Sequence, residues 1–272
     1  MKKAKLFALL PVFTLAACGS GTGSPISEEQ AFERAFEIEN SNALLNVRCI
    51  KGSLTESYSK NGMSESWSCS LNINQQGAFY IKSTETESVS GYSNTGTIEA
   101  YRVFNVGGYS EVVYLKVSES ISGKTTSEAY AYVNGYYGYA VQNYYMVSEA
   151  LDEGPFELAE DFYISPFTAE ERYSIDGASY TFYSKGPGSL TMKIQKRSSG
   201  GGFGYNDDYD YYSDDEYKSY SASITYDNYL MTSGNAQYTT NEGLTYKTSI
   251  NVSYPASLQI TLPNGWQSAL TY

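Results

Sequence analysis

The sequence of 272 residues contains no histidine, and this absence excludes several classes of active site. Ser-His-Asp triads, general acid–base catalysis by imidazole and imidazole metal ligands all need that side chain. Only 18 residues are Lys or Arg, against 30 Asp or Glu, so the formal net charge is −12. An acidic chain is poorly suited to bind nucleic acid. We therefore expect no nucleic-acid partner, and we expect neither a metal nor a cofactor.

The chain also lacks an apolar run long enough to span a bilayer, which takes about 20 residues. The apolar stretch 6–17 is interrupted by Pro11. It is preceded by Lys2, Lys3 and Lys5. A basic segment, a short apolar segment and small residues before a cleavage site make up a secretory signal. Residues 1–17 are thus predicted to be a signal peptide, and its removal changes the net charge to −15.

The predicted signal ends in Leu15-Ala16-Ala17-Cys18, which resembles the lipobox of bacterial lipoproteins at each position. The resemblance implies cleavage between Ala17 and Cys18 and a diacylglyceryl group on the Cys18 sulfur. Two acyl chains are enough for stable anchoring. We therefore expect a lipid-anchored protein on the outer face of a bacterial cell membrane, or on the outer membrane of a diderm host. The alternative is an ordinary signal peptide with a chance cysteine.

Cysteine is scarce, and Cys49 and Cys69 are the pair that remains beside Cys18. An even pair in an extracytoplasmic protein favours a disulfide. A hairpin loop near 57–61 would place the two cysteines opposite each other. Asn61-Gly62 is a strong signal for a two-residue turn, however, and that turn would shift the register and separate the sulfurs. Both a disulfide and two buried thiols remain open at this point.

The sequence is rich in Tyr, with 29 residues, and Ser and Thr are common, a bias that favours strands over helices. Residues 18–26 read as a flexible tether, and Ser27-Glu28-Glu29-Gln30 as a capping box that opens a helix over about 27–41. From residue 44 the apolar period is two. Strands are expected at 44–50, 67–74, 77–88, 96–106, 110–119, 125–134, 190–195, 219–226, 246–254 and 258–262.

Two stretches interrupt the strand pattern. A helix is expected near 144–151, stopped by Gly154-Pro155, and a second helix is expected to start at 168–171. An acidic insert at 198–216 is long for a hairpin loop, which makes it functional or disordered. Its carboxylates suit Ca²⁺, but it lacks the spacing of an EF-hand loop, so a solvated loop is favoured.

These elements predict a mainly β (α+β) fold: one large, strongly bent antiparallel sheet or half-barrel covered by a few helices. We expect a single domain over 27–263 and a C-terminal tail over 264–272. The element order and the ending Leu258-Gln259-Ile260-Thr261-Leu262-Pro263 are similar to the LolA/LprG-like lipoprotein carriers. That resemblance implies an acyl-chain or glycolipid pocket between sheet and helices. A fully packed core would give the same pattern.

Two functions follow from this interpretation. The first is binding or carriage of a lipid-like ligand in a sheet–helix cavity, with the membrane as partner through the anchor. The alternative is a surface interaction module that uses exposed tyrosines, such as those in Tyr136-Tyr137-Gly138-Tyr139 and at 209–212. Paired carboxylates are the remaining option for catalysis, but no spacing singles out a pair. We therefore expect no enzymatic activity.

Overall fold

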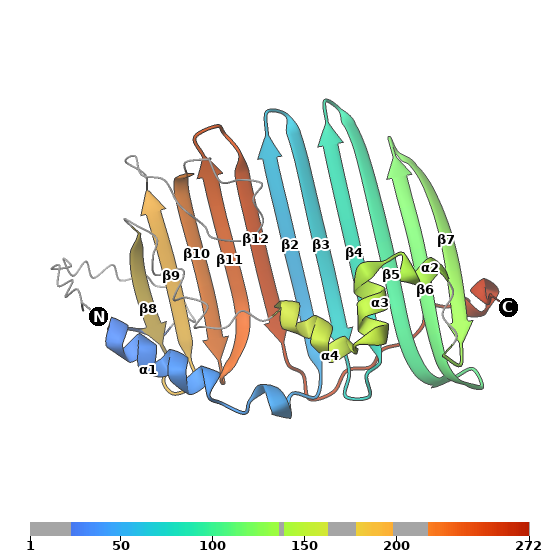
Figure 1. Ribbon diagram of the computed structural model, residues 1–272, viewed down its shortest axis with the longest axis horizontal. Coiled ribbons are helices and arrows are strands. Elements are labelled where there is room, and N and C mark those ends of the chain that lie inside the picture. Colours follow the sequence, from blue (N-terminus) through green and yellow to red (C-terminus); the bar gives the residue numbers. More distant parts are fainter. Residues whose placement is uncertain (1–22, 136–138, 163–177, 198–216, 272) are drawn as a thin grey trace.

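The computed structural model describes residues 23–135, 139–162, 178–197 and 217–271. Over these residues the fold is one open antiparallel sheet of twelve strands, in the order β1-β8-β9-β10-β11-β12-β2-β3-β4-β5-β6-β7, with short helices beside it (Figure 1). The predicted mainly β class with an unclosed, curved sheet is confirmed. The two edge strands, β1 and β7, lie at opposite ends of the order and do not pair with each other.

Consecutive strands pair with each other from β2 to β7 and from β8 to β12, whereas the pairs β12–β2 and β1–β8 join strands that are far apart in the sequence. Their bounds are β1 (Ser24–Ile26), β2 (Ile50–Lys60), β3 (Met63–Ile73), β4 (Phe79–Val89), β5 (Tyr92–Val106), β6 (Tyr109–Ile121), β7 (Lys124–Val133), β8 (Ser179–Ser184), β9 (Leu190–Arg197), β10 (Tyr217–Asp227), β11 (Leu230–Thr240) and β12 (Thr245–Ser253). The β2–β3 turn is the tight one at Asn61-Gly62, where Lys60 pairs with Met63.

The helices are α1 (Glu28–Glu39), α2 (Tyr139–Gln142), α3 (Tyr145–Asp152) and α4 (Pro155–Leu158), with single turns η1 (Leu44–Asn46), η2 (Ala159–Phe162) and η3 (Trp266–Ala269). The expected capping box starts α1: Ser27 Oγ accepts from the backbone N–H of Gln30 at 3.2 Å, and Ser27 N–H donates to Gln30 Oε1 at 3.0 Å. Gly154-Pro155 separates α3 from α4, as the sequence predicts. None of the helices in the described ranges is long and apolar enough to cross a membrane.

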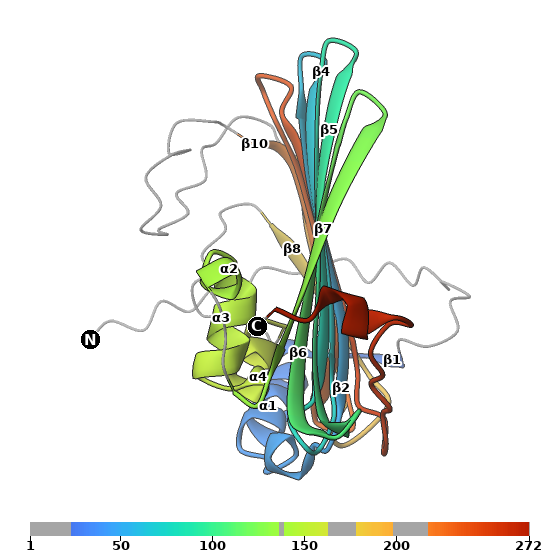
Figure 2. The ribbon, with the colours of Figure 1, turned by 90° about the vertical axis from the view of Figure 1, so that its right-hand side faces the viewer.

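Helices α1 to α4 lie on one face of the sheet, here called the helix-side face, and these described helices cover only one end of the strands (Figure 2). We call that end the proximal half. It contains the β3–β4 and β5–β6 turns. The distal half carries the β2–β3, β4–β5 and β6–β7 turns and projects beyond the described helices. It comprises residues 55–60, 63–68, 84–89, 92–97, 118–121, 124–128, 217–222, 236–240 and 245–249.

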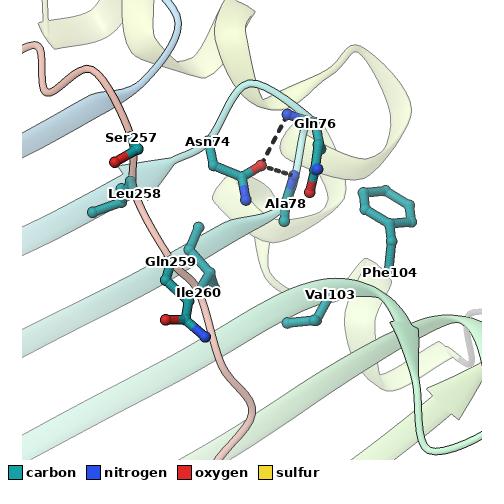
Figure 3. A pocket seen from close by; sticks show the side chains of 9 residues that line it. All are labelled: Asn74, Gln76, Ala78, Val103, Phe104, Ser257, Leu258, Gln259 and Ile260. Carbon is teal, nitrogen blue, oxygen red and sulfur yellow. Dashed lines mark hydrogen bonds between the residues drawn. The ribbon is translucent and has the colours of Figure 1, made fainter.

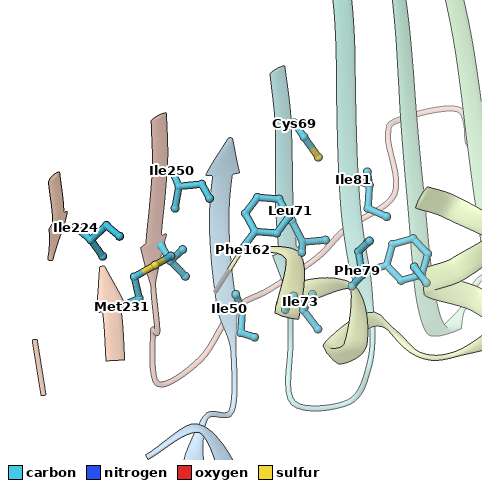
Figure 4. Close-up of a cluster of buried hydrophobic side chains, with 14 of the residues drawn as sticks. Ile50, Cys69, Leu71, Ile73, Phe79, Ile81, Phe162, Ile224, Met231 and Ile250 are labelled. Carbon is cyan, nitrogen blue, oxygen red and sulfur yellow. The ribbon is translucent and has the colours of Figure 1, made fainter. Parts of the chain in front are cut away.

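The main core fills the space between the proximal half and the helices (Figure 4). Phe162 of η2 lies over Gly52 of β2, so close that a Cβ at position 52 would be 2.8 Å from Cδ1 of Phe162. Leu71 and Ile73 of β3 are fully buried in the same layer. Glycine at position 52 thus makes room for an aromatic side chain from the helical layer.

The outer face, opposite the helices, is crossed by the C-terminal segment Tyr254–Thr271 (Figure 2). Trp266 packs there with Val112, Tyr114 and Ala131, and the backbone N–H of Thr271 donates to the carbonyl of Ala131 at 3.0 Å. The segment that we expected as a C-terminal tail is therefore packed on the sheet over residues 264–271.

Three local expectations are corrected. Residues 44–50 were expected as a strand, but Leu44–Asn46 form the single turn η1 and β2 begins only at Ile50. Residues 258–262 alternate like a strand but join no strand ladder: they are extended chain lying across the outer face. The segment shows the same apolar–polar alternation as a strand because its apolar residues, such as Ile260, face the sheet. At the other end of the domain, Ser24–Ile26 of the expected tether forms β1, paired with β8.

Candidate functional site: the distal half of the sheet

Six glutamates lie on the helix-side face of the distal half. Directly paired residues of neighbouring strands share a face, and so do residues two apart along a strand. The register places Glu56, Trp67, Glu85, Gly96 and Glu119 in one row, and Glu65 opposite Glu87 in the next row. The six, called the distal glutamates, are Glu56, Glu65, Glu85, Glu87, Glu119 and Glu128.

The distal glutamates give this face an anionic character. Over β2 to β7, the same face of the distal half holds two lysines, Lys60 and Lys124. Lys60 also forms an ion pair with Glu242 in the β11–β12 turn. Carboxylates therefore outnumber ammonium groups on this surface, and four of them, at positions 85, 87, 119 and 128, are exposed.

A row of four tyrosines continues this face across β10, β11, β12 and β2. Tyr220 pairs with Tyr238, Tyr238 with Tyr246, and Tyr246 with Tyr58. The rings of Tyr238 and Tyr246 stack with centroids 5.0 Å apart and planes inclined by 23°. We call these residues the tyrosine row. These are not the tyrosines named in the sequence as a candidate interaction surface, and three of them, Tyr220, Tyr238 and Tyr246, are half-buried while Tyr58 is exposed.

The tyrosine row is joined to the distal glutamates by hydrogen bonds. The Tyr246 hydroxyl donates to Glu56 Oε1 at 2.9 Å, and the Tyr58 hydroxyl donates to Glu65 on the opposite strand. Burial raises the pKa of Tyr246 well above its usual value, and the bond to Glu56 raises this pKa further because it needs the hydroxyl proton. The tyrosine hydroxyls therefore hold two of the carboxylates in place.

The outer face of the same strands has a different chemistry. Its distal positions on β2 to β7 are all Ser or Thr: Thr55, Ser57, Ser59, Ser64, Ser66, Ser68, Thr84, Thr86, Ser88, Ser93, Thr95, Thr97, Ser118, Ser120, Thr125 and Ser127. Hydroxyls pair across strands, as between Thr84 and Thr97 at 3.3 Å and between Thr86 and Thr95 at 3.1 Å. From β2 to β7, the distal half thus carries an acidic, partly aromatic surface on one side and a neutral hydroxyl surface on the other.

None of the distal glutamates was predicted from the sequence as a site residue. The sequence has no spacing that singles out a catalytic pair, and the sheet distributes the carboxylates over several strands. The segment 83–88, Ser-Thr-Glu-Thr-Glu-Ser, holds the signal, since acidic residues alternate there with hydroxyl residues. Among the described residues, no group of three or more carboxylate, thiol or imidazole side chains is arranged to hold a metal ion.

A cavity of about 300 Å³ lies on the outer face of the proximal half, between the β3–β4 turn, the end of β5 and the C-terminal segment (Figure 3). The cavity is not between the sheet and the helices, where the resemblance to lipoprotein carriers implied one. It is lined by Asn74, Gln76, Ala78, Val103, Phe104, Ser257, Leu258, Gln259 and Ile260.

The disulfide expected between Cys49 and Cys69 does not form, and both thiols are buried. The turn at Asn61-Gly62 places Cys69 opposite Leu54, whereas Cys49 precedes the first residue of β2. Five residues of extended chain correspond to roughly 16 Å, far beyond disulfide reach. The Cys69 sulfur instead lies 4.0 Å from the Met146 sulfur of α3.

Several predicted features lie outside the described residues. They are the cleavage site at Ala17 and Cys18, the lipidation site Cys18, the tyrosines at 136, 137 and 209–212, the helix start at 168–171 and the acidic insert 198–216.

No family model and no curated protein matches the sequence. Among solved structures, the chain is similar to a DUF1329 family protein from Desulfovibrio piger, at 8% identity over 85% of this chain and 94% of that chain, with a TM-score of 0.22. It is also similar to a beta-barrel-like protein of the domain of unknown function DUF1849 from Brucella abortus, at 6% identity over 76% and 96%, with a TM-score of 0.23.

Proposed function

We propose that this chain is a lipid-anchored extracytoplasmic binding protein, with no catalytic role, that captures a cationic polypeptide on the distal helix-side face. The observation that carries the proposal is the joint placement of the distal glutamates and the tyrosine row on one face. Carboxylates attract Lys and Arg over several ångströms. Tyrosine and tryptophan rings add cation–π contacts and rigid contact area.

The expected anchor would favour an orientation in which the distal half points away from the membrane. The described chain enters the domain at β1, where Ser24 pairs with Ser184 at the proximal end of β8. From Cys18 to Ser24 the chain spans at most about 20 Å when fully extended. A lipid on Cys18 would therefore keep the proximal half near the membrane and direct the distal half away from it, toward a soluble partner.

The binding test uses the full chain with Cys18→Ser, a lysine-rich peptide, and the same peptide with acetylated lysines, in titration calorimetry at low salt. The variant Glu85→Gln/Glu87→Gln removes two charges from the helix-side face. Thr84→Lys/Thr86→Lys is the matched control. It changes the net charge of the protein by the same amount, but its two substitutions lie on the outer face. We expect about tenfold weaker binding for the first and about twofold or less for the second. Equal effects, or binding of the acetylated peptide, would reject the proposal.

The anchor has its own test. An alkyne analogue of palmitate should label the wild-type chain and leave Cys18→Ser unlabelled, and that variant should leave the membrane fraction. An unlabelled wild-type chain, with both forms equally membrane-associated, would remove the anchor while leaving the peptide-binding result unaffected.

Carriage of a lipid-like ligand is the second proposal. A large sheet with helices on one face supports it. Phe162 and the other core side chains fill the space beneath the described helices, so an acyl chain would have to displace them. Mass spectrometry of lipids that co-purify with Cys18→Ser tests this: a stoichiometric acyl ligand supports carriage, and its absence together with no uptake of a fluorescent fatty acid removes it.

A further inference from the structure

The outer-face cavity joins two segments that lie far apart in the sequence. One wall is the β3–β4 turn with Asn74 and Gln76, and the other is the part of the C-terminal segment that contains Gln259 and Ile260 (Figure 3). Its volume of about 300 Å³ is at the lower end of the range for small-molecule sites. The cavity lies on the opposite face and at the opposite end of the sheet from the distal glutamates.

The polar groups of the cavity are neutral and partly fixed in orientation. None of the lining residues is charged. Asn74 Oδ1 accepts hydrogen bonds from the backbone N–H groups of Gln76 and Ala78, both at 3.0 Å, so its Nδ2 is held as a donor that points toward the cavity. Side-chain amides both donate and accept. Asn74, Gln76 and Gln259 therefore offer donors and acceptors without net charge.

The C-terminal wall adds backbone groups. Among the backbone hydrogen bonds of the described residues, none involves residues 256–261, although this segment lies across the sheet. Backbone N–H and C=O groups that are not paired in the protein need another partner, which is water or a ligand. The segment thus presents further donors and acceptors beside the amide side chains.

The remaining lining is apolar. Ala78 and Ile260 are buried, and Val103 and Phe104 are partly exposed. An ionised ligand would lose its hydration here without gaining a counter-charge. A sugar ring presents hydroxyls that donate and accept at its edge and C–H groups on its faces. We infer that this cavity binds an uncharged sugar residue.

The sugar can come from a free oligosaccharide or from the head group of a neutral glycolipid. The glycolipid source rests on the proposed anchor, which would keep the proximal end near the membrane. The test uses the full chain with Cys18→Ser. The probes are maltose, lactose and chitobiose in solution, and phosphatidylcholine vesicles with and without monogalactosyl diacylglycerol. Binding is measured by saturation-transfer NMR for the sugars and by sedimentation for the vesicles.

The variant Gln76→Ala/Gln259→Ala removes two amides from the rim, and Gln267→Ala removes an exposed amide from the same C-terminal segment away from the cavity. We expect about tenfold weaker sugar binding for the double variant and about twofold or less for Gln267→Ala. Binding of a free disaccharide assigns the soluble source, and binding only to galactolipid vesicles assigns the head group.

The inference is overturned if none of these sugars binds, if the double variant binds like Gln267→Ala, or if a neutral extended peptide binds the cavity in place of a sugar. The lysine-rich peptide separates this result from the proposed function, because the double variant should bind that peptide as tightly as the parent does.

Discussion

The proximal and distal halves of the sheet are built from the same strands but have opposite surroundings. In β3, Leu71 and Ile73 are fully buried beneath the helices, whereas Met63 at the distal end is 51% exposed. In β4, Phe79 and Ile81 are buried and Glu85 and Glu87 are exposed. A single strand therefore changes from part of a two-layer core to part of a sheet that none of the described helices covers.

The two halves must be stabilised by different interactions. Burial of apolar side chains contributes most of the stability of a core. In the distal half that term is small, so the strand ladders, the tight turns and the cross-strand pairs carry the structure. Tyr238 stacked on Tyr246, and Thr86 bonded to Thr95, are such pairs. Core packing therefore constrains the identity of the distal side chains less than that of the proximal ones.

The largest expected effect is in the proximal half. Leu71→Ala removes a fully buried side chain of β3 and should lower the free energy of unfolding by about 2–5 kcal/mol. Ser66→Ala, in the distal half of the same strand, should change it by about 0.5 kcal/mol or less. Urea denaturation of both variants measures the difference. Similar losses in the two variants would show that the distal half is as tightly packed as the proximal half.

The contrast between the halves explains which parts of the fold the sequence predicts. The alternation of β4, β6 and β10, the capping box at Ser27 and the helix stop at Gly154-Pro155 are local signals, and the corresponding elements form as predicted. The pairing of β12 with β2 and the burial of Trp266 on the outer face depend on contacts between distant residues. A period of two does not distinguish a strand from extended chain, which is why residues 258–262 were misassigned.

The candidate site was predicted only in part. Abundant tyrosine indicated an interaction surface, but the tyrosine row requires the register of four strands, and that register is set by turns and by pairing across β12 and β2. The cysteine pair shows the same limit. The turn signal at Asn61-Gly62 competed with the disulfide expectation, and the turn sets the register.

A second prediction concerns the turns that hold the distal half together. Gly62 lies at φ +81° in the β2–β3 turn, with no heavy atom near the position of a Cβ. Gly62→Ala should therefore act through backbone strain alone and destabilise by about 1–2 kcal/mol. Gly96→Ala is the matched control, because that distal glycine also faces open space but has no left-handed backbone. Its effect should be neutral or slightly stabilising, and a larger loss at position 96 than at 62 would contradict the explanation.

A smaller effect is expected from the tyrosine row. Tyr238→Leu keeps an apolar side chain on β11 but removes the ring that stacks on Tyr246, which should cost about 0.5–1.5 kcal/mol. The same change at Tyr92, which is 75% exposed at the start of β5, should have almost no effect on stability. Thermal unfolding followed by circular dichroism compares the two. If Tyr92→Leu were as costly, the loss would reflect a general tyrosine preference of the sheet rather than the stack.

The smallest effect concerns the free energy of unfolding at alkaline pH. It compares one half-buried tyrosine of the proximal half with one of the distal half. Burial is the main cause that raises the pKa of Tyr101 in the proximal half and of Tyr246 in the distal half above the usual 10.0. A raised tyrosine pKa means that the folded state keeps its proton where the unfolded state loses it. The stability that these groups contribute is therefore complete below pH 10 and falls as the pH rises through the raised pKa values.

Tyr101→Phe and Tyr246→Phe remove the titrating groups, so each should flatten the fall of stability with pH. Urea denaturation across this pH range measures the stability, and tyrosinate absorbance follows the titration. If both substitutions flatten the fall, the Tyr246 hydroxyl is shielded from water in solution as it is in the structure, although none of the described helices covers the distal half. If only Tyr101→Phe flattens it, the hydroxyl of Tyr246 is solvated and its pKa is not raised by burial.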